Sequence, residues 1–414
     1  MDNLRRLQSD WQFDGYKVLE GRHSIILDGE DIVDVLPQDE ADQKYGHIEP
    51  ETFEGCTIMP GMVNCHAHVI MPGDGSEAEV MFGRDNEILL LQGYTNALKS
   101  LASGVTTLAD FGDRDDITFH LREAIECGAA IGPRMILSGR PLTIPEGHAW
   151  NMNGVVRNEA EARALAREVF SKGADVLKIM ASGGGTAGSD PYNPQFPVSI
   201  LEACVEEARE AGKPTAAHTS NIQCIREVIE AGFDIVAHGS FHDSEGNLVG
   251  LDPVSAEMAL ERGVYWNPTL AVARSGIRHM EKTGTGDPEV LAEKKAKWAR
   301  RAEGVRQMYE MGIPVIAGSD EGFGTYAFGG HWLELEALVD AGIPEDAVLS
   351  GTTILPARAL GMDHLVGSLE SGKKADLMIV AGKPFEDITL TAKAERVILA
   401  GEDVDLGETF LDFE

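Results

Sequence analysis

Amphipathic stretches that end in a glycine, each followed by a short apolar run, recur along most of the chain. The runs include VTTLAD, RMILSG and FDIVAH, and the glycines that precede such runs are Gly104, Gly128, Gly173, Gly212, Gly232, Gly263 and Gly312. A glycine just past a helix end adopts the left-handed conformation that other residues resist, so each of these glycines predicts a helix end. The runs that follow are almost continuously apolar, which is typical of strands buried on both faces.

The alternation of strands and helices predicts the fold. With the run CTIMPGMVNC at residues 56–65, the chain has eight predicted strands, separated by helical patterns, across residues 58–350. Eight β-α units in one sheet indicate an α/β protein with a (β/α)8 barrel, the TIM barrel. The alternative is a doubly wound open sheet, which usually has fewer strands.

Both ends of the chain differ from the middle. Residues 1–57 and 357–414 contain short alternating runs, such as HSIILDG and ADLMIVAG, with glycine turn signals and no helical period. We therefore expect the two ends to pair into one small β-sandwich beside a barrel formed by residues 58–356. The basic stretch at residues 287–311 predicts a helix with a solvated charged face.

The charge balance excludes several classes of partner. The 414 residues include 68 acidic and 35 basic side chains, a net charge of −33, which repels nucleic-acid backbones and anionic membranes. No apolar run is long enough to span a membrane and the N-terminus has no apolar signal segment, so we expect a cytoplasmic protein. The acidic surface suits a high-salt cytoplasm, and the alternative is an ordinary acidic coat that favours solubility.

The cysteines agree with that location. They are odd in number and lack paired spacing or a CxxC motif: Cys56, Cys65, Cys127, Cys204 and Cys224. This usage predicts reduced thiols rather than disulfides or a zinc finger.

Metal-ligand side chains follow the predicted strands at their carboxyl ends. In chain order they are His66, His68, Lys178, His218, His238 and Asp320. Because the carboxyl ends of barrel strands converge on one mouth, these side chains predict a site for a zinc-like divalent metal. Each also has a simpler interpretation: a lone histidine can be a core residue, and Asp320 can cap a helix. A buried Lys178 is costly as a cation and needs a partner or a lowered pKa.

Several longer motifs carry a resemblance to a known family. They include MPGMVNCHAH at 59–68, GVTTLADFG at 104–112, LKIMASGG at 177–184, GKPTAAH at 212–218, AGSDEG at 317–322 and VGSLESGKKADLMIVAGKPFEDI at 366–388. In these motifs the chain resembles the amidohydrolase superfamily, and within it the imidazolonepropionase-like and Xaa-Pro dipeptidase-like branch. The last motif resembles the C-terminal sandwich signature of the family.

The resemblance implies a binuclear metal centre, with zinc as the expected metal. His66, His68 and Asp320 would hold the more buried ion, and His218 with His238 the more exposed one. Lys178 would be carboxylated by CO2 and bridge the two ions. A hydroxide shared by the metals would be the nucleophile, with Asp320 as the proton shuttle. His148, in TIPEGHAW, resembles a family histidine that touches the substrate.

The function implied is hydrolysis of a C–N bond in a small molecule by a homo-oligomer, with dipeptides or N-acyl amino acids as first candidates. Ser220 stands where dipeptidase-like members often carry a substrate-binding tyrosine, which weakens the case for Xaa-Pro dipeptides. Glu321 and Asp190 could instead face a cationic group of the substrate. The alternatives are hydrolysis of a urea, a carbamate or an aryl amide, a lactonase, and a binder without catalytic activity.

Overall fold

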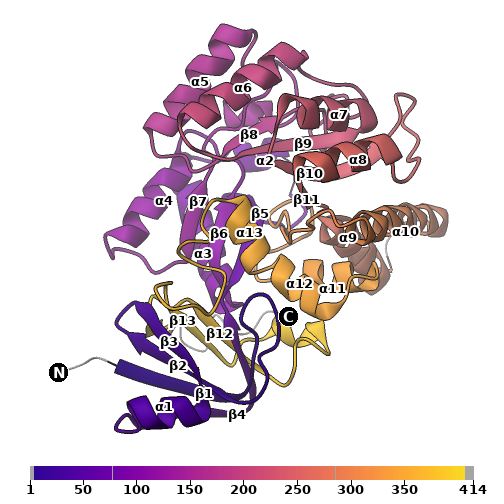
Figure 1. Cartoon of the computed structure of the whole chain (residues 1–414). Helices are drawn as coiled ribbons and strands as arrows, with labels where there is room; N and C mark the ends of the chain where they lie inside the picture. The colour runs from indigo at the N-terminus through magenta and orange to yellow at the C-terminus, as the bar shows by residue number, and fades with distance from the viewer. Residues whose placement is uncertain (1–3, 77, 285, 406–414) are drawn as a thin grey trace.

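The fold combines one mixed sheet, drawn at the bottom of Figure 1, with two parallel sheets and their helices above it. The computed structural model describes residues 4–76, 78–284 and 286–405, so part of the predicted C-terminal segment, residues 406–414, lies outside it. None of the helices in these ranges is both long and apolar enough to cross a membrane.

The mixed sheet is built from both ends of the chain. It has seven strands in the order β14-β13-β12-β4-β1-β2-β3. The strands are β1 (Leu4–Gln12), β2 (His23–Asp28), β3 (Asp31–Pro37), β4 (Glu51–Pro60), β12 (Leu377–Ala381), β13 (Arg396–Leu399) and β14 (Glu402–Asp403). β12 pairs antiparallel with β4, which joins the C-terminal strands to the N-terminal ones. The two ends therefore share a sheet, as predicted, while a sandwich of two packed sheets stays a prediction.

The N-terminal region contains a helix where only strands were predicted. α1 (Gln38–Tyr45) follows β3 and packs the buried Ala41 against the sheet. Lys44 donates to Asp34 on β3 at 2.7 Å, and Arg6 of β1 pairs with Asp42. Hydrophobic periodicity did not predict this helix because it has no apolar stripe. Side-chain hydrogen bonds and ion pairs hold it against the sheet instead.

The run predicted as the first barrel strand is two strands. β4 ends at Pro60 and β5 (Met62–Ala67) begins after Gly61. β4 therefore continues past residue 57, where the N-terminal segment was predicted to end, and a single residue separates it from the first strand of the parallel sheets. A side chain at Gly61 would meet Oγ1 of Thr106 at 2.1 Å, and the Gly61 N–H donates to the carbonyl oxygen of Asp376. Only glycine fits at this crossing.

The parallel sheets alternate with helices along the chain. One sheet has the order β5-β6-β7 and the other β11-β10-β9-β8. The remaining strands are β6 (Val105–Asp110), β7 (Arg134–Leu137), β8 (Leu177–Met180), β9 (Thr215–Asn221), β10 (Ile235–His242) and β11 (Tyr265–Asn267). The α-helices after α1 are α2 (Ala78–Phe82), α3 (Asn86–Ala102), α4 (Ile117–Glu126), α5 (Glu159–Ser171), α6 (Val198–Glu210), α7 (Ile222–Ala231), α8 (Pro253–Arg262), α9 (Leu270–Thr283), α10 (Pro288–Glu310), α11 (Trp332–Asp340), α12 (Glu345–Gly351) and α13 (Ile354–Ala359). Two short 3-10 helices are η1 (Trp150–Met152) and η2 (Ile388–Ala392).

Backbone hydrogen bonds link the two parallel sheets on both sides. The run predicted as the eighth strand, residues 313–320, is not a regular strand, but Ile316 N–H donates to Trp266 O of β11 and Cys65 N–H of β5 donates to Ala317 O. On the other side, Met180 N–H of β8 donates to Leu142 O, in the loop after β7. The architecture is α/β, as predicted, and is consistent with a TIM barrel.

The glycines that predicted helix ends do follow helices. All seven have φ between +66° and +97°, the region that favours glycine. They stand one or two residues after the ends of α3, α4, α5, α6, α7, α8 and α10. The boundaries read from this pattern are therefore confirmed.

Candidate metal centre and active site

One cavity brings together the six predicted metal ligands and the predicted substrate-contacting histidine. It has a volume of about 310 Å³, and its lining includes His66, His68, His148, Lys178, His218, His238 and Asp320. His66, Lys178, His218 and His238 lie on β5, β8, β9 and β10, and His68, His148 and Asp320 lie in the segments after β5, β7 and α10. Residues that are far apart in the sequence thus meet where the ends of the parallel strands meet, as expected for this fold.

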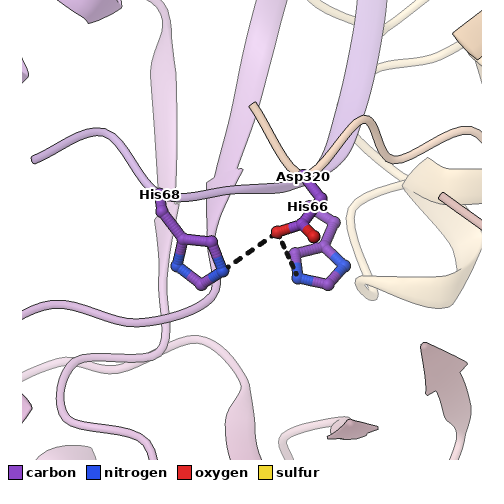
Figure 2. Close-up of side chains that lie close together, drawn as sticks. All are labelled: His66, His68 and Asp320. Carbon is purple, nitrogen blue, oxygen red and sulfur yellow. Dashed lines mark ion pairs between the residues drawn. The ribbon is translucent and has the colours of Figure 1, made fainter. Parts of the chain in front are cut away.

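Three of these residues form the tightest group. Nε2 of His68 lies 3.2 Å from Oδ1 of Asp320, and Nε2 of His66 lies 3.6 Å from the same oxygen (Figure 2). One ligand atom from each residue lies within 4.8 Å of the others. Two imidazole nitrogens and a carboxylate oxygen converging on one point are a suitable donor set for a divalent zinc-like ion.

Asn267, which the sequence analysis missed, orients His66. Its Oδ1 lies 2.8 Å from Nδ1 of His66, so the ring donates there and its Nε2 lone pair faces Asp320. The Asn267 amide donates in turn to the carbonyl oxygen of Gly318 at 3.0 Å. The sequence did offer a signal for it, since Asn267 is a polar residue at the end of the apolar run VYWN.

His218 and His238 face each other with ring centroids 4.4 Å apart. Nε2 of His218 donates to the carbonyl oxygen of Gly183 at 3.1 Å, which leaves its Nδ1 as the free nitrogen. Nδ1 of His238 contacts Oγ1 of Thr269 at 2.8 Å, which leaves its Nε2 free. The outer hydrogen bonds thus leave opposite nitrogens free on the two rings, Nδ1 of His218 and Nε2 of His238.

Burial keeps most of these imidazoles neutral. Desolvation lowers the pKa of His66, His218 and His238 well below the ordinary value, helped by the neighbouring Lys178 and histidines. Burial also acts to lower the pKa of His68, but the hydrogen bond and charge of Asp320 outweigh it and the pKa is raised. Neutral imidazole is the form that binds metals.

Lys178 is buried without a carboxylate partner. No ion pair within 4.0 Å reaches it from the described part of the chain; its Nζ lies 3.5 Å from Nε2 of His66 and 4.9 Å above the ring of Phe111. Burial lowers the pKa of Lys178 to about 7, with only partial compensation from Asp320 and Cys65. Near neutral pH the amine is therefore substantially uncharged, the form that can react with CO2.

Three polar residues at the site have left-handed backbone conformations without being glycine. They are His238 at φ 66°, Thr269 at φ 48° and Asp320 at φ 59°. The conformation is most unfavourable for the β-branched Thr269. Such strain persists where surrounding contacts impose it. Here it orients the predicted metal ligands His238 and Asp320, and Thr269, which contacts His238.

His148 lies beside His218, with ring centroids 4.4 Å apart. The N–H of Thr186 donates to Nδ1 of His148 at 3.4 Å, so the proton of the neutral ring is on Nε2. Burial lowers the pKa of His148 to about 3. A Cβ at Gly184 would lie 2.8 Å from Nε2 of both His148 and His218, so glycine is needed for this approach.

Two acidic residues considered for a cationic substrate group are used by the protein itself. Glu321 is buried and accepts hydrogen bonds from Asn64 at 2.9 Å and from the N–H of Gly330 at 2.7 Å. Asp190 accepts from the N–H of Tyr192 and the side chain of Asn193. Neither lines the cavity, so the expectation of a cation-binding group at these residues is corrected.

A basic residue lines the cavity instead. Arg301 belongs to the stretch predicted as a solvated face, yet its Nη2 donates to the carbonyl oxygens of Pro268 at 2.6 Å and His238 at 3.5 Å. Most of the other charged side chains of α10 are exposed, as predicted.

Comparison with known proteins assigns the family. The amidohydrolase family matches residues 57–404, and the chain belongs to this family. Ochratoxinase from Aspergillus niger is 24% identical over 410 residues, covering 90% of this chain and 80% of the relative. Imidazolonepropionase from Symbiobacterium thermophilum is 26% identical over 389 residues, covering 88% and 84%.

A solved Xaa-Pro dipeptidase with methionine bound in its active site is similar over 97% of this chain and 100% of that chain, with a TM-score of 0.84 and 27% identity. The predicted resemblance is therefore confirmed, and these neighbours imply a TIM-barrel fold. The chain is an enzyme of a metal-dependent family of hydrolases that act on C–N bonds.

Proposed function

We propose that the protein is a binuclear metal-dependent amidohydrolase that cleaves an amide bond of N-acyl amino acids or dipeptides. The observation that carries the proposal is the convergence of four imidazoles, a carboxylate and an unpaired buried lysine in one cavity. Divalent cations held there would supply Lewis-acid activation of the scissile carbonyl and of water.

The donor set supports two ion positions, with zinc as the proposed metal. His66, His68 and Asp320 would hold one ion, since their ligand atoms already lie within 4.8 Å of one another. His218 and His238 would hold the second through the nitrogens that their outer hydrogen bonds leave free. Lys178 would bridge the two ions as a carbamate, which turns an unpaired buried amine into an anionic oxygen ligand.

Two side chains are assigned to proton transfer and to polarisation. Oδ2 of Asp320 lies 4.0 Å from Nδ1 of His238, and Oδ1 lies 3.2 Å from Nε2 of His68, so the carboxylate lies between residues assigned to the two ions. It would take the proton of the attacking water and pass it to the leaving amine. His148, neutral and protonated on Nε2, would donate a hydrogen bond to the oxyanion that develops on the scissile carbonyl.

The proposed substrate class follows from the relatives and from the cavity. The solved dipeptidase binds methionine, a free amino acid, in its active site. The cavity of this chain combines apolar side chains, such as Met71, Phe82 and Phe323, with the polar ligand cluster. Such a lining suits an apolar acyl or side-chain group next to a polar reacting bond.

The test is hydrolysis of a substrate library by zinc-loaded protein: N-acyl amino acids, dipeptides, aryl amides, ureas and lactones. Amide bonds of the first two classes should be cleaved with the highest kcat/KM. Turnover of ureas or lactones alone would contradict the proposed substrate class. Metal analysis on the same sample should find close to two ions per chain, and one ion would contradict the binuclear centre.

We further propose that residues 58–356 form a closed eight-stranded barrel and that the terminal sheet belongs to a sandwich of residues 1–57 and 357–414. The hydrogen bonds that join β11 to residues 313–317, and those residues to β5, support closure. A homo-oligomer is also proposed, and sedimentation of the metal-loaded protein would test it.

A further inference from the structure

Arg301 is a cation in the active-site cavity without a carboxylate partner. Its side chain lines the cavity, and among the described residues no acidic oxygen lies within ion-pair distance of it. Asp320 and Glu334 act on it only at longer range, and burial lowers the pKa of its guanidinium. A partly desolvated charge of this kind is costly unless an anion pairs with it.

The hydrogen bonds of Arg301 leave most of its guanidinium available. Nη2 makes both contacts to backbone carbonyl oxygens, at 2.6 Å and 3.5 Å. Nε and Nη1 make no hydrogen bond to the described part of the chain. Both two-donor edges of a guanidinium include Nη2, so the free N–H groups of Nη1 and Nε would each give a single charge-assisted hydrogen bond to a carboxylate oxygen.

Arg301 also lies close to the reacting centre. One of its two acceptors is the carbonyl oxygen of His238, a residue proposed to hold a metal ion. Ser220, at the position of the tyrosine in dipeptidase-like members, is occupied: its hydroxyl lies 3.3 Å from both Gly183 O and Nε2 of His218. Arg301 is thus the cation in this cavity best placed to receive an anionic group next to the scissile bond.

We propose that Arg301 binds the free carboxylate of the substrate and so selects N-acyl amino acids and dipeptides over neutral amides. This inference rests on the proposed function and deepens it. The carboxylate replaces the counter-ion that the protein does not supply. The apolar side chains of the cavity are then left for the acyl group or the amino-acid side chain.

The experiment compares an N-acyl amino acid with its carboxamide, using metal-loaded wild-type protein and the variants Arg301→Met and Arg301→Lys. In the wild type the acid should be preferred. Arg301→Met should lower kcat/KM for the acid roughly 10- to 100-fold and change that for the amide by less than about threefold. Arg301→Lys should restore part of the preference.

Arg300→Met is the matched control. Arg300 is the adjacent arginine and also donates to a backbone carbonyl oxygen, that of Leu248, but it does not line the cavity. The Arg300→Met variant should keep the wild-type preference for the acid over its carboxamide. An equal loss for acid and amide in Arg301→Met would overturn the proposal, because it would mean that Arg301 only holds the backbone carbonyls of Pro268 and His238 in place.

Calorimetric binding separates this inference from the proposed function. N-acetyl-phenylalanine should bind wild-type protein more tightly than N-acetyl-phenylalanine amide, and Arg301→Met should remove the difference. If the wild type hydrolyses neither compound, the proposed function fails, and this binding comparison still decides the role of Arg301. Equal binding of acid and amide by the wild type would overturn the inference.

Discussion

Replacing Asn267 with leucine should loosen the proposed metal site without touching a metal ligand. The side chain of Asn267 accepts from Nδ1 of His66 at 2.8 Å and donates to Gly318 O at 3.0 Å, all in the buried interior. Leucine keeps the volume but leaves an imidazole N–H and a carbonyl oxygen unpaired. Each such group costs about 1–3 kcal/mol, so the free energy of unfolding should fall by about 2–6 kcal/mol.

The loss of orientation should appear in metal affinity. Removing a hydrogen-bond partner of a ligand histidine typically weakens metal binding about 10- to 100-fold, or roughly 1.4–2.7 kcal/mol. Competition with a chelator of known affinity measures this loss, and chemical denaturation of the metal-free protein measures stability. The two measurements separate an effect on the site from an effect on the fold.

Gln12→Leu is the matched control. Gln12 is a buried amide in the terminal sheet that donates to Ser9 O at 2.9 Å and accepts from the N–H of His23 at 3.0 Å. It should lose similar stability and keep wild-type metal affinity. If both variants bind metal as the wild type does, Asn267 does not orient His66 and the reasoning is refuted.

Three further predictions concern single side chains. Lys178→Ala should lose at least one bound metal ion and most activity, as metal analysis would reveal; full occupancy would contradict the carbamate bridge. Asp320→Asn should lower kcat by roughly 100-fold or more with an unchanged circular dichroism spectrum, and near-normal turnover would refute its role in proton transfer. Asp113 accepts from the N–H and hydroxyl of Thr118 through Oδ2, while its buried Oδ1 has no partner, and burial raises its pKa to about 6. The folded state holds this proton more tightly than the unfolded state, so the wild type loses stability as pH rises from about 4 to about 6. Across that window the free energy of unfolding of Asp113→Asn, measured with urea, should rise by roughly 3 kcal/mol relative to that of the wild type. A difference that does not change with pH would contradict this.

The parts of the fold that the sequence predicted are those governed by local chemistry. A glycine after a helix is required by its own backbone conformation, so Gly104 and Gly232 located helix ends regardless of their neighbours. The residues proposed as metal ligands could be grouped from the sequence because parallel strands share one direction and their ends meet. The break at Gly61 escaped prediction, since it depends on the side chain of Thr106 from another strand. Asn267 escaped for the same reason: its partners His66 and Gly318 are distant in sequence.

The half-buried position of Arg301 was missed because the high charge content of its helix outweighed the spacing of its apolar residues. The stretch around it is rich in charge, so the whole helix was assigned to solvent. The buried residues of α10 include Val305 and Met308, and Trp298 packs partly against the same core. Arg301 stands three residues after Trp298, four before Val305 and seven before Met308, which is the spacing of one helix face. A cation on the apolar stripe of a helix is forced toward the interior by its neighbours, and it persists there only if the site supplies acceptors. In this chain those acceptors are the backbone carbonyl oxygens of Pro268 and His238, and Arg301 lines the cavity where the substrate is proposed to bind.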